Sequence, residues 1–163
     1  MVHQSVQPRL SRWKAAGTVV VLAAAGAVVA SQHVATAAPA RTLTAAQAQP
    51  RKCHGDLARG RQGVSGFEVT APSTGLVRVR LDPSSQRFKD ADWDVAVFDR
   101  ATRQAVAASA GLRSYEIADG HVTAGTTLWV QGCRYRGDAR TVNVSVTFVA
   151  APAAGARAGS DPA

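Results

Sequence analysis

The sequence predicts an all-β protein, an antiparallel β-sandwich of jelly-roll or immunoglobulin-like type with about seven or eight strands. Three observations lead to this fold class. Between residues 51 and 150, short runs alternate apolar and polar residues with period two. Clusters of Gly, Pro, Asp and Ser separate these runs. After the first 37 residues, no segment shows the period of an amphipathic helix.

Each expected strand is a run with one apolar face. The run 75–82 places Val77, Val79 and Leu81 on one face and arginines on the other. The run 141–149 alternates in the same way, with valines and a phenylalanine facing inward. Alanines give the segment 101–110 helix propensity, but its length and its flanking strands favour β, with the expected strand at 104–109. The remaining expected strands are 66–69, 91–99, 114–117 and 126–133.

The first 37 residues are typical of a secretory signal peptide. Three cations and no acid precede an uncharged apolar run, 15–30, which is shorter than the roughly 20 residues that span a bilayer. The small residues of Ala35-Thr36-Ala37 predict cleavage before Ala38. The protein is therefore expected to be secreted to the extracellular space. The alternative is an uncleaved, N-terminally membrane-anchored protein.

The rest of the chain divides by composition. Residues 38–50 are mostly Ala, Thr, Gln and Pro and are expected to form a flexible leader. Residues 51–150 are expected to form the single β-sandwich domain. Residues 151–163 form an Ala/Gly/Pro tail that is expected to be disordered.

The charge balance argues against nucleic acid as a partner. Lys and Arg total 19 against 11 Asp and Glu, a formal net charge of +8. The predicted signal peptide contains three of these cations, so the mature chain has 16 against 11. The remaining cations are dispersed, whereas a nucleic-acid surface needs a clustered basic stripe with interleaved aromatic residues.

The chain has two cysteines, Cys53 and Cys133. In an exported protein, an intramolecular disulfide is the simplest interpretation of such a pair. Closing a loop of about 80 residues stabilises a fold by roughly 4–5 kcal/mol on the chain-entropy model. A zinc site is not indicated, because Cys53-His54 and Cys133 lack the paired ligand spacing of such sites.

Catalytic motifs are not found. After signal removal the histidines are His54 and His121, and neither belongs to a zinc-hydrolase motif. There is no Gly-x-Ser-x-Gly elbow and no phosphate-binding glycine loop. The protein is therefore not expected to be an enzyme, with a small hydrolase or a protease inhibitor as less favoured alternatives.

Four carboxylates form the best candidate metal site. Asp90, just before the predicted strand 91–99, alternates with Asp92 and Asp94 within it, and Asp99 ends the strand. Convergent carboxylates suit Ca²⁺, which takes six to eight oxygen ligands. The alternative is ion pairing with nearby cations, without metal. No other cofactor is expected.

Exposed aromatic and basic residues are candidates for a binding surface. Tyr135 stands between Arg134 and Arg136 and is expected to be exposed. Trp93 and Trp129 lie in mid-strand, where aromatic side chains pack into a core more often than they form a sugar-stacking platform.

The order of the strands resembles the bacterial pre-peptidase C-terminal (PPC) domain, as found beside secreted actinobacterial zinc carboxypeptidases. The resemblance covers about 63–149 and rests on an Asp-x-Asp strand at 92–99, a small-residue strand ending in Ser109 and the Ala-Gly-Thr turn at 124–126. It implies a β-sandwich, export and a noncatalytic accessory role beside a peptidase, sometimes with Ca²⁺ or matrix binding. A secreted peptidase, extracellular matrix or polysaccharide would then be the partner.

Overall fold

The computed structural model describes residues 34–48, 55–83, 92–111 and 115–152. Within these ranges the chain forms nine strands and no helix, and every strand pairing is antiparallel. The strands are β1 (Ala35–Ala37), β2 (Arg41–Thr44), β3 (Val64–Thr70), β4 (Gly75–Pro83), β5 (Asp92–Asp99), β6 (Ala105–Ser109), β7 (Glu116–Val122), β8 (Thr127–Arg136) and β9 (Thr141–Ala150).

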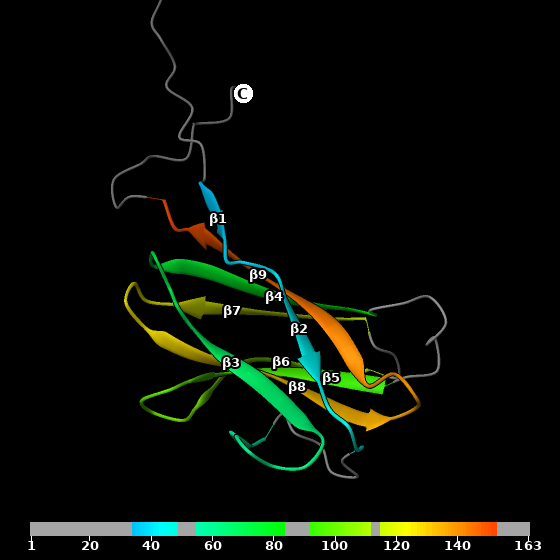
Figure 1. Cartoon of the computed structure of the whole chain (residues 1–163). Helices are drawn as coiled ribbons and strands as arrows, with labels where there is room; N and C mark the ends of the chain where they lie inside the picture. The colour runs from blue at the N-terminus through cyan, green and yellow to red at the C-terminus, as the bar shows by residue number, and fades with distance from the viewer. Residues whose placement is uncertain (1–33, 49–54, 84–91, 112–114, 153–163) are drawn as a thin grey trace, which may run out of the picture. The chain divides into compact units, whose positions relative to one another are not determined.

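The strands form two sheets (Figure 1). In the five-stranded sheet, called sheet A, β4 pairs with β7 and β9, and the other edge of β9 pairs with both β1 and β2. In the four-stranded sheet, called sheet B, the order is β3-β8-β5-β6. The long pairing of β4 with β9 needs a glycine at its start, since a Cβ on Gly75 would lie 2.1 Å from the carbonyl oxygen of Val149.

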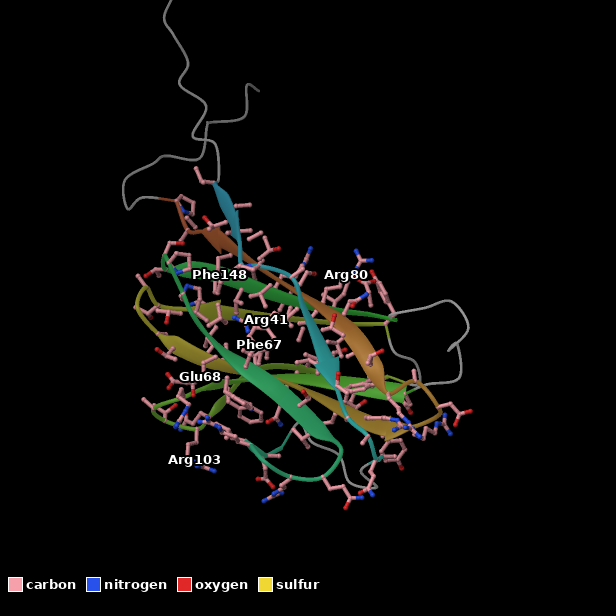
Figure 2. The ribbon with its side chains drawn as sticks, in the orientation of Figure 1. Arg41, Phe67, Glu68, Arg80, Arg103 and Phe148 are labelled. Carbon is pink, nitrogen blue, oxygen red and sulfur yellow. The ribbon has the colours of Figure 1, made fainter. Side chains whose placement is uncertain are left out.

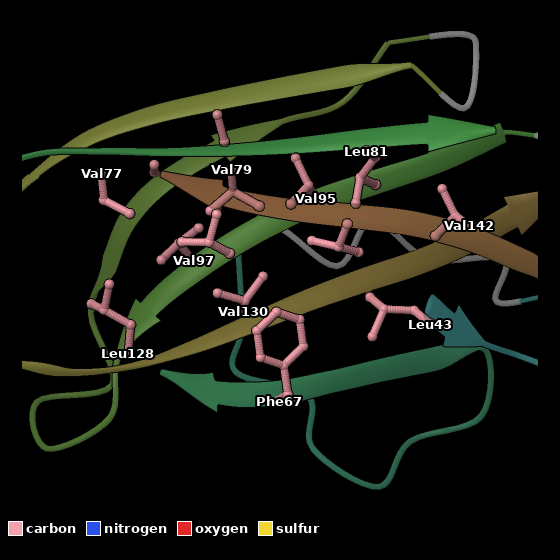
Figure 3. Packing of buried hydrophobic residues seen from close by; sticks show 14 of the residues in the cluster. Leu43, Phe67, Val77, Val79, Leu81, Val95, Val97, Leu128, Val130 and Val142 are labelled. Carbon is pink, nitrogen blue, oxygen red and sulfur yellow. The ribbon is translucent and has the colours of Figure 1, made fainter. Parts of the chain in front are cut away.

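Apolar residues from both sheets meet in one core (Figure 3). The alternation in β4 and β9 points every second residue into this core, as the sequence predicts. Sheet B contributes residues of β3, β5 and β8, including the completely buried Trp93. Two facing antiparallel sheets around one core make the fold β-sandwich-like and confirm the all-β prediction.

The outer face of sheet B carries a second, smaller apolar cluster. Ala96, Phe98 and Trp129 are buried there, with Leu57 packed against them. Since Trp93, Val95 and Val97 face the main core, both faces of β5 are covered. This explains why seven consecutive residues of β5 are buried.

Two strands lie in a part of the chain where the sequence predicts none. β2 falls within 38–50, the expected flexible leader, and corrects that expectation, because it pairs with β9 and buries Leu43 to 4% exposure. β1 falls within the predicted signal peptide and pairs with the end of β9, but all three of its residues are exposed. Residues 153–163 of the expected tail and most of the signal peptide lie outside the described residues.

Candidate functional site

Of the aspartates predicted to bind Ca²⁺, Asp99 lies far from Asp92. Asp92 and Asp99 are the two ends of β5, about 23 Å apart along an extended strand. Asp99 instead caps the following turn, where its Oδ1 accepts hydrogen bonds from the backbone N of Ala101 and Thr102 at 2.8 and 2.9 Å. Both bonds lower the pKa of Asp99, and the bond from Thr102 has the larger effect. Asp90 lies outside the described residues.

Asp92 is a buried carboxylate with an ion-pair partner that sequence reasoning did not find. Its side chain is 4% exposed, and its Oδ2 lies 3.3 Å from Nε of Arg136 on β8. Asp92 and Arg136 are opposite each other in the β5–β8 pairing. In the described part of the chain, Oδ1 of Asp92 has no hydrogen-bond partner. Burial raises the pKa of Asp92, Arg136 opposes the shift, and the charge of Glu116 adds to it.

The neighbouring carboxylates are also held by the protein. Glu116 is buried and accepts hydrogen bonds from the Ser109 hydroxyl and, at 2.6 Å, from the backbone N of Gly111. Asp94 is buried and has an interaction partner. Among residues 34–48, 55–83, 92–111 and 115–152, no group of three or more His, Cys, Asp or Glu is placed to hold a metal ion.

Arg134 is a structural residue, which corrects its assignment to an exposed binding surface. It is 7% exposed. Its Nη1 donates hydrogen bonds to the carbonyl oxygens of Ala45 and Ala46 at 3.1 and 2.9 Å, and its Nε donates one to that of Gly137 at 3.2 Å. Arg134 therefore ties the segment after β2 to the turn between β8 and β9. Tyr135 and Arg136 do lie at the surface.

The other predicted residues that the structure describes are spread over three strands, β5, β7 and β8. His121 is exposed on β7, and His54 and Cys53 are outside the described residues. Cys133 is buried on β8. Trp93 packs in the core, as expected, and donates a hydrogen bond to the carbonyl oxygen of Ala139 at 3.0 Å. Trp129 is buried too, but in the outer cluster of sheet B.

The outer face of sheet A exposes apolar side chains that sequence reasoning did not single out. Of the large apolar residues that are exposed, Leu76, Tyr115 and Ile117 lie on this face. Arg78 forms a two-bond ion pair with Asp119, at 2.8 and 2.7 Å. These bonds raise the pKa of Arg78 and lower that of Asp119.

Arg80 connects the polar and apolar parts of this face. Its guanidinium lies 4.9 Å from the centre of the Tyr115 ring and donates hydrogen bonds to Asp82 at 3.0 and 2.7 Å. Ile117 is its neighbour across the β4–β7 pairing. The charges of the face therefore neutralise one another, while its apolar side chains stay exposed.

A hollow of about 640 Å³ lies at one end of sheet B. Figure 2 shows Glu68 and Arg103 on this side of the molecule and Arg80 on the side of sheet A. The hollow lies where the turns β5–β6 and β7–β8 meet β3. It is lined by Glu68, Asp99, Arg100, Ala101, Ala124, Gly125, Thr126 and Thr127.

The segment before β3 is fixed to the outer face of sheet B by Gln131, which is completely buried. Its Oε1 accepts hydrogen bonds from the backbone N of Ala58 at 3.0 Å and from Nε1 of Trp129 at 3.1 Å. Its Nε2 donates one to the carbonyl oxygen of Asp56 at 2.9 Å. Arg59 of this segment lies over the Trp129 ring, 5.2 Å from the ring centre.

Comparison with known proteins assigns no family. No protein-family model matches the sequence, and no curated protein matches it. In the described part of the chain, no helix has the length and apolarity that crossing a bilayer requires.

Proposed function

We propose that the protein is a secreted, noncatalytic accessory module that docks onto a partner protein, as its resemblance to the PPC domain implies. The observation that carries this proposal is the outer face of sheet A, where the large apolar side chains of Leu76, Tyr115 and Ile117 are exposed. A protein interface needs apolar contact area and few unpaired charges. The ion pair of Arg78 with Asp119 meets the second requirement.

A secreted peptidase is the partner that the family resemblance favours. Size-exclusion chromatography of culture medium tests this partner: the protein is expected to elute together with casein-hydrolysing activity and at a mass above its own. Ile117→Asp puts a charge in the middle of the proposed interface and should return the protein to its own mass. Glu68→Gln, on the side of sheet B, is the matched control. Elution at the mass of the isolated chain for all three proteins contradicts the proposal.

Export and the disulfide are part of the same proposal. Cys133 lies two residues from Gln131 on the same face of β8, about 7 Å along the strand. Gln131 holds Asp56, and Cys53 precedes Asp56 by three residues, a reach of at most about 10 Å. These distances allow a Cys53–Cys133 bond. The secreted protein should then start at Ala38 and have a mass 2 Da below that of the dithiol form, since each disulfide removes two hydrogens.

A Ca²⁺-stabilised module is the second candidate, and Asp92 is the observation that favours it. A buried carboxylate oxygen without a partner is costly unless a cation or a proton reaches it. If Ca²⁺ binds there, EDTA lowers the Tm and Asp92→Ala abolishes that response. If protonation of Asp92 takes the place of a bound cation, EDTA leaves the Tm unchanged, and the Ca²⁺ candidate is rejected.

A further inference from the structure

The hollow beside Glu68 has the chemistry of a site for a hydroxylated ligand. Oε1 of Glu68 accepts hydrogen bonds from Nε of Arg100 at 2.9 Å and from Nη1 of Arg59 at 3.4 Å. These two bonds hold the carboxylate in place. Its second oxygen has no hydrogen-bond partner in the described part of the chain and is free to accept one. A fixed carboxylate beside a guanidinium offers an acceptor next to donors, which suits two adjacent hydroxyl groups of one ligand.

The opposite wall of the hollow supplies further hydroxyls. Thr126 and Thr127 line it, and Oγ1 of Thr127 lies 3.5 Å from Oγ1 of Thr70. The backbone N of Arg100 donates a hydrogen bond to the carbonyl oxygen of Thr127 at 2.9 Å, which joins the two turns that form the walls. Gly125 has no heavy atom within 4 Å of the position of a Cβ, so this wall is open to a ligand.

An aromatic ring lies next to the hollow. Trp129 is the neighbour of Glu68 across the β3–β8 pairing, and both are on the outer face of sheet B. The guanidinium of Arg59 lies over the indole, the Arg59 side chain is 57% exposed, and Leu57 packs against the same cluster. An arginine on the surface can move aside at little cost, because such an exposed contact is weak. An indole bordered by a carboxylate and a guanidinium can receive the C–H face of a sugar ring while the polar groups bind its hydroxyls.

We propose that this hollow is a binding site for one sugar ring of a neutral polysaccharide. Glu68 and Arg100 bind two neighbouring hydroxyls of the sugar, and Thr127 binds a third. The sugar ring then stacks on the Trp129 indole, in the place of the Arg59 guanidinium. An anionic ligand fits less well, because Arg59 and Arg100 already share the carboxylate of Glu68. An apolar ligand fits less well too, because the lining contains no apolar side chain larger than alanine. This site lies on a different sheet from the docking face proposed above and does not depend on it.

Titration of the purified full chain with soluble oligosaccharides tests the site. The probes are cellohexaose, xylohexaose and chitohexaose, and binding is followed by calorimetry and by tryptophan fluorescence. Saturable binding of at least one probe is expected, with a change in fluorescence from Trp129. Glu68→Gln and Arg100→Ala should each weaken binding about tenfold, because each removes a charge-assisted hydrogen bond.

Asp119→Asn is the matched control, because it removes an exposed, arginine-paired carboxylate on sheet A. It should bind the oligosaccharide with the affinity of the unmodified protein. Circular dichroism melts establish that each variant is folded. The proposal is overturned if none of the three probes binds, if Glu68→Gln binds as tightly as the unmodified protein, or if Asp119→Asn weakens binding equally. Loss of protein docking in Ile117→Asp with retained sugar binding would separate this site from the function proposed for sheet A.

Discussion

Gln131 and Ala58 are joined by a 3.0 Å hydrogen bond between a completely buried side chain and the backbone of the segment before β3. The same side chain also binds Asp56 and Trp129. One glutamine on the outer face of sheet B thus holds both a covering segment and an indole. Because β8 also carries Cys133 on this face, the covering segment and the proposed disulfide stabilise the same surface.

Replacing Gln131 by alanine should destabilise the fold by about 2 kcal/mol or more. The change leaves Nε1 of Trp129 without its acceptor and releases two backbone groups of the covering segment, and each buried polar group without a partner costs about 1–3 kcal/mol. Urea unfolding followed by fluorescence measures the loss. Gln104→Ala is the matched control, because Gln104 is exposed. A loss no larger than that of the control contradicts the role of Gln131.

Leu43→Ala tests whether β2 is part of the core. Leu43 is 4% exposed and packs closely against Gly132 of sheet B, so its truncation should cost about 2–5 kcal/mol. Thr42→Ala, one position away, removes only an exposed hydrogen bond to Asn143 and should cost under about 1 kcal/mol. Equal unfolding midpoints for the two variants would mean that 38–50 is the flexible leader that the sequence suggests.

Truncation separates the contributions of β1 and β2. A chain that starts at Ala38 lacks β1, whose three residues are exposed, and should keep its Tm within a few degrees, because little apolar area is lost. A chain that starts at Ala45 also lacks β2 and the side chain of Leu43, and should melt much lower or fail to fold. Thermal melts of both chains give the comparison. A large loss in the first chain would mean that cleavage before Ala38 yields an unstable protein.

The fold was predictable where each strand has one clearly apolar face. β4 and β9 alternate valine with polar residues, and both were identified from this pattern. The sequence predicts that β7 ends at 117, but the strand continues to Val122. Its inward-facing positions before Val122 hold only the small residues Ala118 and Gly120, so the sequence shows no apolar alternation there. β2 contains a single large apolar residue. It is a strand because β9, about 100 residues away in sequence, pairs with it, and no local pattern shows such a pairing.

The candidate sites were less predictable, because each depends on residues from several strands. The sequence placed Arg134 at the surface, but the backbone after β2 covers it. The partner of Asp92 is Arg136, on a strand that lies some 40 residues further along the chain. The hollow combines residues of β3 with two turns that follow it. A pattern within one segment cannot show any of these contacts.

Arg103 has a backbone conformation that favours glycine. Its φ is 62°, and it stands in the turn between β5 and β6, where its backbone N donates a hydrogen bond to the carbonyl oxygen of Asp99 at 2.8 Å. Left-handed conformations cost non-glycine residues roughly 1–2 kcal/mol. Arg103→Gly should therefore be more stable than Arg103→Ala by about 1 kcal/mol, measured by urea unfolding. The alanine variant is the control, because it removes the same side chain but keeps the strain. Equal stability of the two variants would contradict the expectation.

The raised pKa of Asp92 predicts how stability depends on pH. Burial places the folded-state pKa above the unfolded one, so the ionised carboxylate costs stability. This cost is absent below about pH 4, where the carboxyl is protonated in both states, and it appears as the pH rises through the folded-state pKa. Asp92→Asn should therefore raise the Tm at pH 7 in EDTA, and the gain should shrink as the pH falls toward 3. The variant removes the ion-pair partner of Arg136, but this costs little stability, because the Arg136 side chain is 59% exposed and stays hydrated.

Asp119→Asn provides the control of opposite sign. Arg78 lowers the pKa of Asp119, so ionised Asp119 contributes stability above the unfolded pKa, and this contribution is lost as the pH falls through the folded one. Asp119→Asn should therefore lower the Tm slightly at pH 7. Addition of 1 M NaCl should reduce this loss, because the ion pair of Arg78 with Asp119 is exposed. Circular dichroism melts of both variants between pH 3 and 7 give the two trends. If Asp92→Asn lowers the Tm at pH 7 in EDTA, its ionised carboxylate stabilises the fold and Arg136 outweighs the cost of burial.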